Sequence, residues 1–354
     1  MEYVNQELVQ QLETLCNKSG LPGNESSVRK VIRKYLEAYG DHMRVDAIGN
    51  LYVEKKAKGN AKLRVMIAAH MDEVGFMVVN SSDDEFYEFR VLGGIDPRVL
   101  PAKSVLIGKN GIRGVISPRT AHLTKAEERK QVVSVEQLRI NVGKENTGKI
   151  NAGDYVSFDT QFSPMGEGFV AKALDDRVGC VNLIWLLQHA PEDIDVIGVF
   201  TVQEELGLRG ATIAANQVKP DIALVLDTTP SIDPPLMDSE DENTFYNTRL
   251  GHGPVVYTVD RGQIHDPRYI KYIVDIAEDM KIPYQKRQPG GGGTDGSAIH
   301  LQASGIPCQS VSVPVRYLHT PRSFMRLDDW NHTLQLLHAT LTNISANIFD
   351  EERK

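Results

Sequence analysis

Acidic and imidazole side chains follow apolar segments at several places in this 354-residue chain. These residues are His70, Asp72, Asp175, Asp176, Glu204, Glu205, Asp227 and His319. Each apolar segment would anchor a buried element, and a charged group beside it is costly to bury without a partner. Carboxylates gathered at one sheet edge repel one another, and one bound cation relieves that repulsion less well than two. The pattern therefore predicts a metal site, most simply for two divalent ions.

Each of these residues also has an ordinary structural explanation when it is taken alone. An acid at a strand end is usually a helix cap or a solvated turn residue. A lone histidine such as His70 or His319 is more often a surface residue or a hydrogen-bonded core residue. The Glu204-Glu205 pair is typical of an exposed helix start. All of these explanations would have to coincide at one sheet edge, and we therefore favour the metal site.

The elements expected around these residues alternate between strands and helices. Apolar segments at 64–70, 194–202, 222–227 and 308–313 predict buried strands. Helices are predicted at 178–190 and 208–217, from Asp266-Pro267 to 280, through Ile299, and from Asp328 onward. The first sixty or so residues are expected to be helix-rich, with Gly40 ending one helix. This order predicts an α/β fold with a central sheet, whose strand ends form the site.

Between residues 75 and 162 the pattern changes to short alternating segments broken by glycines and prolines. This pattern predicts a compact β domain, with a loop or short helix over 122–136. The insertion would leave the α/β sheet just after His70 and return near Phe169. We therefore expect a β-rich domain at 73–165, inserted into a catalytic domain made of 1–72 and 166–354.

Composition narrows the function classes. The chain is 41% hydrophobic and 24% charged with a formal net charge of −8, which is typical of a globular protein and argues against nucleic-acid binding. Cys16, Cys180 and Cys308 are far apart and suit a reducing compartment. The sequence shows no secretory signal and no apolar stretch of about 20 residues that would span a membrane. We expect a cytoplasmic protein with neither nucleic-acid nor membrane partners.

Six separated motifs resemble one known family. The segments AAHMDEVGFMV, AKALDDRVGC, TVQEELGLRGA, LVLDTT, GGGGTDGSAIH and RYLHTP, in this order over essentially the whole chain, resemble the dinuclear metallo-aminopeptidases of the tetrahedral (TET) and glutamyl aminopeptidase type. The resemblance implies a mixed central sheet flanked by helices, as in zinc exopeptidases, and a barrel-like inserted domain for dimerisation. It also implies a homododecamer built from dimers, whose small entrances admit short peptides but not folded proteins.

The resemblance assigns roles to the residues of the predicted site. It implies that His70, Asp175 and Asp227 bind one metal and that Asp175, Glu205 and His319 bind the other. Glu204 would be the general base, and Asp72 would orient His70 as a partner of a metal-bound histidine. The peptide bond between Asp175 and Asp176 would be cis. The sequence fits either aspartate as the bridge between the metals.

These roles imply a hydrolase that removes amino-terminal residues from short cytosolic peptides. Peptide hydrolysis at neutral pH needs an activated water, a Lewis acid and a base. The mixed nitrogen and oxygen ligands suit zinc or cobalt, and manganese is also allowed. Two alternatives stay open: a deacylase or deblocking amidohydrolase with the same metal centre, and a scaffold protein without activity.

The substrate pocket is less well defined by the sequence. Gly291, Gly292 and Arg316 are the candidate substrate-binding residues. The glycine run at 290–293 would form a flexible pocket wall or a plain solvent loop, and it lacks the Lys-Ser/Thr end of a phosphate-binding loop. Arg287, Arg316 and Arg322 could recognise an acidic first residue, although a solvated arginine is the commoner case. Neutral aliphatic first residues are equally allowed.

Overall fold

The central element of the fold is an eight-stranded mixed sheet. The structure is a computed structural model that describes residues 3–80, 84–119, 121–234, 248–287 and 292–350. The strands lie in the order β1 (Met43–Val45), β2 (Leu51–Lys55), β13 (Asp195–Thr201), β3 (Arg64–His70), β14 (Ile222–Pro230), β17 (Cys308–Val315), β15 (Val255–Tyr257) and β16 (Gln285–Arg287). The central four, β13, β3, β14 and β17, run parallel, and both flanks include antiparallel pairs. The predicted mixed sheet is confirmed.

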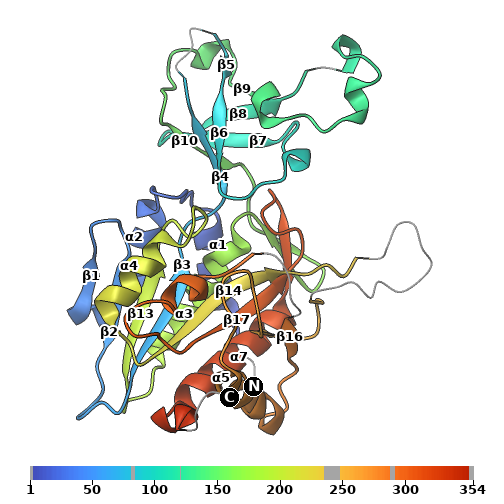
Figure 1. Cartoon of the computed structure of the whole chain (residues 1–354). Coiled ribbons are helices and arrows are strands. Elements are labelled where there is room, and N and C mark those ends of the chain that lie inside the picture. Colours follow the sequence, from blue (N-terminus) through green and yellow to red (C-terminus); the bar gives the residue numbers. More distant parts are fainter. Residues whose placement is uncertain (1–2, 81–83, 120, 235–247, 288–291, 351–354) are drawn as a thin grey trace.

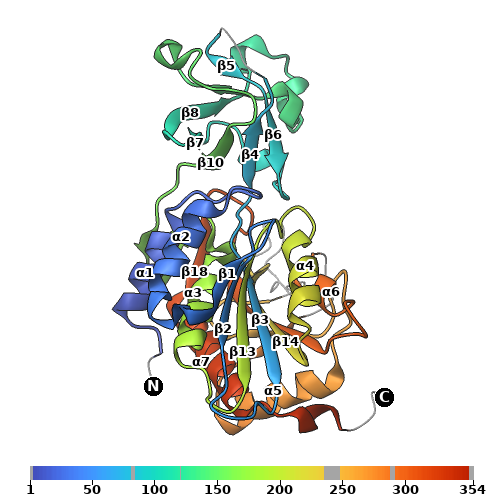
Figure 2. The same cartoon turned by 90° about the vertical axis from the view of Figure 1, so that its left-hand side faces the viewer.

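Helices cover both faces of this sheet (Figure 2). One face packs against α1 (Gln6–Cys16), α2 (Ser26–Tyr35), α3 (Leu174–Gln188), α5 (Pro267–Asp279) and α7 (Leu327–Asn343), and the other against α4 (Arg209–Val218) and α6 (Gly296–Ile299). The start of α5 follows the predicted pattern, because the Asp266 side chain accepts a hydrogen bond from the Arg268 backbone N–H and Pro267 fills the first turn. Apolar residues from the helices and strands bury both faces of the sheet.

A second sheet of seven antiparallel strands projects beyond one end of the central sheet (Figure 1). Its order is β5 (Phe86–Tyr87), β9 (Arg139–Asn141), β8 (Ile112–Ser117), β7 (Ser104–Ile107), β10 (Tyr155–Phe158), β4 (Gly75–Val78) and β6 (Phe89–Leu92). The strands at the two ends of this order, β5 and β6, are separated in the chain only by Glu88, so the sheet nearly closes into a barrel. This sheet has a hydrophobic core of its own, in which Phe76 packs edge-on against Phe89 and Phe158.

Short 3-10 helices and a small third sheet complete the chain. The predicted loop or short helix at 122–136 contains η3 (Ala121–Leu123), η4 (Glu128–Lys130) and η5 (Val135–Gln137); the other 3-10 helices are η1 (Glu37–His42), η2 (Pro97–Val99), η6 (Lys144–Asn146) and η7 (Ala346–Phe349). The third sheet, of β11 (Ser163–Met165), β12 (Gly168–Ala171) and β18 (Ser323–Arg326), was not predicted. No helix among the described residues is both long and apolar enough to cross a membrane.

The expectation of a helix-rich first sixty residues was wrong for its last third. The helix α2 ends at Tyr35, before Gly40, and β1 and β2 occupy residues 43–55. Leu51, Tyr52 and Val53 are all buried because β2 lies between β1 and β13 and helices cover the sheet. Burial on both sides removes the alternation of polar and apolar residues by which a strand is usually recognised.

Candidate active site

The predicted acidic and imidazole residues come together at one end of the central sheet. His70 is the last residue of β3, and it lies opposite Thr201, the last residue of β13, so the Glu204-Glu205 pair follows directly beside it. Asp175 is in the first turn of α3. His319 follows β17, with a backbone φ of +55° in the left-handed region. The parallel strands thus deliver residues that are far apart in the sequence to one place.

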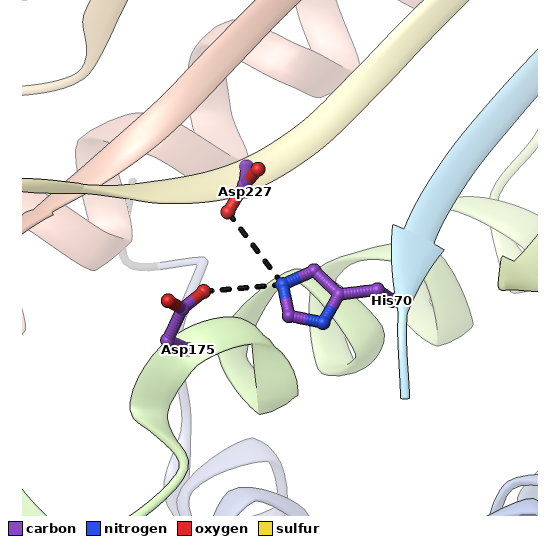
Figure 3. A group of neighbouring side chains, drawn as sticks. All are labelled: His70, Asp175 and Asp227. Atoms are coloured by element: carbon purple, nitrogen blue, oxygen red, sulfur yellow. Dashed lines mark hydrogen bonds and ion pairs between the residues drawn. The ribbon is translucent and has the colours of Figure 1, made fainter. Parts of the chain in front are cut away.

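Two groups of side chains share Asp175. The His70 Nε2 atom lies 3.2 Å from Asp175 Oδ1 and 3.9 Å from Asp227 Oδ1 (Figure 3). On the other side, His319 Nε2 lies 3.2 Å from Asp175 Oδ2 and 3.4 Å from Glu205 Oε1. Within each group of three residues, the potential ligand atoms lie within 4.8 Å of one another. The two histidines therefore approach different oxygens of one carboxylate.

The geometry distinguishes Asp175 from its neighbour. The peptide bond between Asp175 and Asp176 is cis, as the resemblance implied. The Asp176 carboxylate accepts hydrogen bonds from the backbone N–H groups of His70, at 3.2 Å, and Gly179, at 3.0 Å. The Asp176 carboxylate therefore binds backbone N–H groups, whereas the Asp175 carboxylate faces both histidines.

The hydrogen bonds of His70 show that this site suits a cation. The Asp72 carbonyl oxygen lies 3.1 Å from His70 Nδ1, and a carbonyl only accepts, so Nδ1 carries the proton of the neutral ring. The other ring nitrogen, Nε2, faces the oxygens of Asp175 and Asp227; it donates to Asp175 when the ring is charged and offers a lone pair to a metal ion when the ring is neutral. Glu205 Oε1 is likewise buried, with no hydrogen bond from any residue that the structure describes. Acceptors that converge in this way fit a divalent metal.

Burial and mutual repulsion act on the carboxylates of the site. Burial raises the pKa of Glu205 to about 7, with Asp175 adding repulsion. Burial likewise raises the pKa of Asp227 well above its usual range, again with a contribution from Asp175. For Asp175, burial also acts to raise the pKa, but hydrogen bonds with His319 and His70 outweigh it and the net shift is downward. Asp175 is thus the carboxylate most strongly held in its charged form.

One detail of the sequence prediction was wrong. Asp227 does not close its strand, because β14 continues to Pro230, and residues 228–230 pair with residues 313–315 of β17. Asp227 lies within the ladder opposite Ser312, and its side chain is 8% exposed. Its position is consequently set by the pairing of β14 with β17 rather than by a loop.

Asp72 links the histidine side of the site to the glutamate pair. Its carboxylate accepts hydrogen bonds from the backbone N–H groups of Glu204, at 3.0 Å, and Glu205, at 3.1 Å, and it lies 3.6 Å from His70 Nδ1. Glu204 belongs to neither potential metal group among the described residues. Burial raises the pKa of the Glu204 carboxyl well above its usual range. A half-buried carboxylate beside the ligands, but outside both groups, suits a proton acceptor.

A buried ion cluster beneath the site was missed in the sequence. Lys172 Nζ lies 2.8 Å from both carboxylate oxygens of Glu73, and Arg177 Nη2 lies 3.4 Å from Glu73 Oε1. All three side chains are at most 3% exposed. Arg177 also donates to the carbonyl oxygens of Met71 and Leu15. The cluster joins the segment after His70 to the start of α3, where Asp175 lies.

Asp295 is a second buried acid near the site that sequence reasoning did not select. Its carboxylate accepts a hydrogen bond from Thr201 Oγ1 at 2.5 Å, at the end of β13. Burial raises the pKa of Asp295 to about 6. The signal was present in the GGGGTDG motif, in which this acid follows the glycine run after a single threonine.

The predicted substrate-binding residues are only partly accounted for. Gly291 lies outside the described residues, and Gly292 has a φ of +82° that favours glycine. Arg316 forms an ion pair with Asp233, with 2.7 Å between Nε and Oδ1. Arg287 is buried over the ring of Tyr257, 4.4 Å from its centroid. The Arg316 and Arg287 side chains therefore have structural contacts of their own.

Glu25 provides a pH test of the loop that carries the glutamate pair. Its Oε1 accepts from the backbone N–H groups of Gly23 and Gln203, and burial raises its pKa from 4.5 to about 7. A raised carboxyl pKa favours folding at low pH, and this contribution is lost as the pH rises from 4.5 through 7. We expect Glu25→Gln, whose Oε1 can accept both bonds, to gain roughly 2–3 kcal/mol relative to wild type between about pH 4 and pH 8. Urea unfolding at several pH values measures this difference; a constant difference would contradict it.

The whole chain resembles proteins whose structures are known. It shares 32% identity with the aminopeptidase APDkam598 from the archaeon Desulfurococcus kamchatkensis, over 97% of this chain and 96% of that one, with a TM-score of 0.89. It shares 31% identity with the TET1 peptidase of Pyrococcus horikoshii, over 95% and 100% of the two chains, with a TM-score of 0.83. That peptidase can assemble into a tetrahedron or a large octahedral shell.

A family model for M42 glutamyl aminopeptidases matches residues 49–336. The chain belongs to the M42 glutamyl aminopeptidase family. Among the relatives of this M42 aminopeptidase, the glutamyl aminopeptidase of Lactococcus lactis is 29% identical, over 96% of this chain and 97% of that protein. The lysyl aminopeptidase of Pyrococcus furiosus is 26% identical, over 96% and 98%. The names of these two relatives thus refer to different amino-terminal residues.

Proposed function

We propose that this M42 aminopeptidase uses two metal ions to remove the first residue from short peptides with a free amino end. The observation that carries the proposal is the position of Asp175, which presents one oxygen to His70 and the other to His319. His70, Asp175 and Asp227 would hold one ion, and Asp175, Glu205 and His319 the other. Zinc or cobalt suits these ligands best, and manganese is also compatible.

The residues around the ions divide the remaining work. Bound divalent ions supply Lewis acidity to the scissile carbonyl and to the attacking water. Glu204 accepts the proton of that water and returns it to the leaving amine, a role supported by its raised pKa. Asp72 holds both the His70 ring and the backbone of the glutamate pair in place. Asp227 or Glu205 supplies the negative partner for the free α-amine of the substrate.

An acidic first residue is a finer proposal, supported by the name of the Lactococcus relative. Arg316 is a weaker candidate for recognising such a residue than the sequence suggested, because its guanidinium pairs with Asp233. A panel of aminoacyl anilides, tested on metal-free protein reloaded with each metal in turn, measures both the preferred first residue and the working metal.

The division into domains and the assembly belong to the same proposal. We assign residues 73–165 to an inserted domain, supported by a sheet and core separate from the rest of the chain, and 1–72 with 166–354 to the catalytic domain. We propose that the inserted domain joins dimers and that these build a dodecamer, as the assemblies of the Pyrococcus horikoshii relative suggest. Analytical ultracentrifugation tests this directly, and a monomer at working concentration contradicts it.

Metal removal tests the proposed function. We expect complete chelation to abolish hydrolysis of aminoacyl anilides, because both the carbonyl and the water lose their Lewis acid, and we expect added zinc, cobalt or manganese to restore it. We expect His319→Ala to bind about one metal fewer per chain, since His319 contacts only one group. Elemental analysis after dialysis counts the metals.

The matched control is His332→Ala, which changes a partly exposed histidine on α7 and should leave the metal content unchanged. Hydrolysis that survives complete metal removal would show that the proposed mechanism is wrong. Hydrolysis of N-acetylated but not free peptides would instead identify a deblocking enzyme. Inactivity with every divalent metal would favour a scaffold protein.

A further inference from the structure

A polar cavity of about 600 Å³ adjoins the proposed metal site. The segment between β6 and β7 contributes Arg98 and Lys103 to the wall of this cavity, and the loop after β17 contributes Tyr317, Thr320 and Arg322. Thr320 also lines the small neighbouring cavity that contains Asp175, Glu205 and His319. The two cavities therefore meet at Thr320, next to the residues of the proposed metal site.

Two cationic residues of this cavity, Arg98 and Arg322, lie within a few residues of the metal site along two separate segments, and Lys103 lines the same cavity. On the barrel side, a Cβ built at Gly94 would lie 3.4 Å from His319 Nδ1, and Arg98 follows four residues later. On the other side, Arg322 follows His319 by three residues. An extended chain advances about 3.3–3.6 Å per residue, so their Cα atoms lie within roughly 14 Å of the site. A peptide bound at the metals would reach them two to four residues after the bond that is cut.

The residues that line the cavity carry more positive than negative charge. Arg98 is paired with Asp96, and the lining carboxylate Asp159 lies 3.4 Å from Arg113 Nε. Across the residues that the structure describes, neither the Lys103 nor the Arg322 side chain has a carboxylate within ion-pair distance. Both residues are exposed on the cavity wall. Two cations from separate segments that line one cavity suit a bound carboxylate.

We propose that this cavity binds a carboxylate of the peptide substrate, two to four residues after the scissile bond. This inference rests on the proposed function, because it takes the metal site as the place of cleavage. The carboxylate has two possible sources, the free carboxyl end of a peptide of about three to five residues or an acidic side chain in a longer one. In either case the cavity selects part of the leaving peptide and does not contact the first residue.

The test compares matched peptides that carry the best first residue from the anilide panel. In the first pair, Ala-Ala follows the first residue, and the carboxyl end is free in one peptide and amidated in the other. In the second pair, the first residue is followed by Ala-Glu in one peptide and Ala-Gln in the other, and both peptides are amidated. For the true carboxylate source, we expect wild-type protein to show a KM about tenfold lower than for its neutral match. We expect the double variant Lys103→Gln with Arg322→Gln to lose this preference. The control Lys109→Gln removes an exposed charge elsewhere on the same sheet and should keep it.

Titration calorimetry on the Glu204→Gln background gives the same comparison without turnover. There we expect the Kd ratio between charged and neutral peptides to fall from about ten to about one in the double variant. Equal affinities for both members of each pair in the parent protein, or a preference that survives the double variant, would overturn the proposal. Failure to hydrolyse any anilide would count against the proposed function instead, and the calorimetric ratio would still decide whether the cavity binds a carboxylate.

Discussion

Replacing Glu204 with glutamine is expected to lower kcat on an aminoacyl anilide by about 10²- to 10⁴-fold while both metals stay bound. Glutamine has nearly the same shape but cannot accept the proton of the attacking water. The Glu204 side chain belongs to neither potential metal group among the described residues, so its loss should not release an ion. Steady-state kinetics together with elemental analysis of the same sample measure both effects.

Two results would separate this role from a structural one. The Glu204 backbone N–H, which donates to Asp72, is untouched by the substitution, so the fold of the loop should persist. Glu13→Gln removes an exposed carboxylate on α1 and serves as the control with normal kcat. Near-normal kcat in Glu204→Gln would show that another group is the base. Loss of a metal would show that Glu204 is a ligand.

Replacing Glu73 with glutamine is expected to lower the free energy of unfolding by about 3–5 kcal/mol. The substitution leaves the buried cations Lys172 and Arg177 without their shared carboxylate, and burial already lowers the pKa of Lys172. A loss of this size is a large part of the roughly 5–15 kcal/mol that stabilises a typical domain. Urea denaturation of wild-type and variant proteins, both saturated with the same metal, gives the difference.

A second substitution identifies the cause of that loss. Adding Lys172→Met to Glu73→Gln removes one of the uncompensated charges, so the double variant should recover part of the lost stability. The control Glu192→Gln breaks the exposed ion pair with Lys58 and should leave the free energy of unfolding nearly unchanged. A Glu73→Gln variant as stable as this control would show that the buried cluster contributes little.

Much of the architecture could be predicted from the sequence, because periodicity and capping act locally. The apolar run of β3, the Asp266-Pro267 start of α5 and the alternating segments of the barrel-like sheet were all recognisable from neighbouring residues. The types of residue at the proposed site were also visible, since buried acids and histidines are costly unless something binds them. Local patterns did not reveal β2, whose burial depends on partners distant in the sequence.

The partner that each carboxylate oxygen faces became visible only in the folded structure. The sequence allowed either Asp175 or Asp176 to bridge two metals, and the structure turns Asp176 toward backbone N–H groups and Asp175 toward both histidines. The structure also pairs Arg316 with Asp233, which is 83 positions away in the sequence, and Glu73 with Lys172, which is 99 positions away. Secondary structure follows from residues that are neighbours in the sequence. Ion pairs and side-chain directions depend instead on how distant elements pack together.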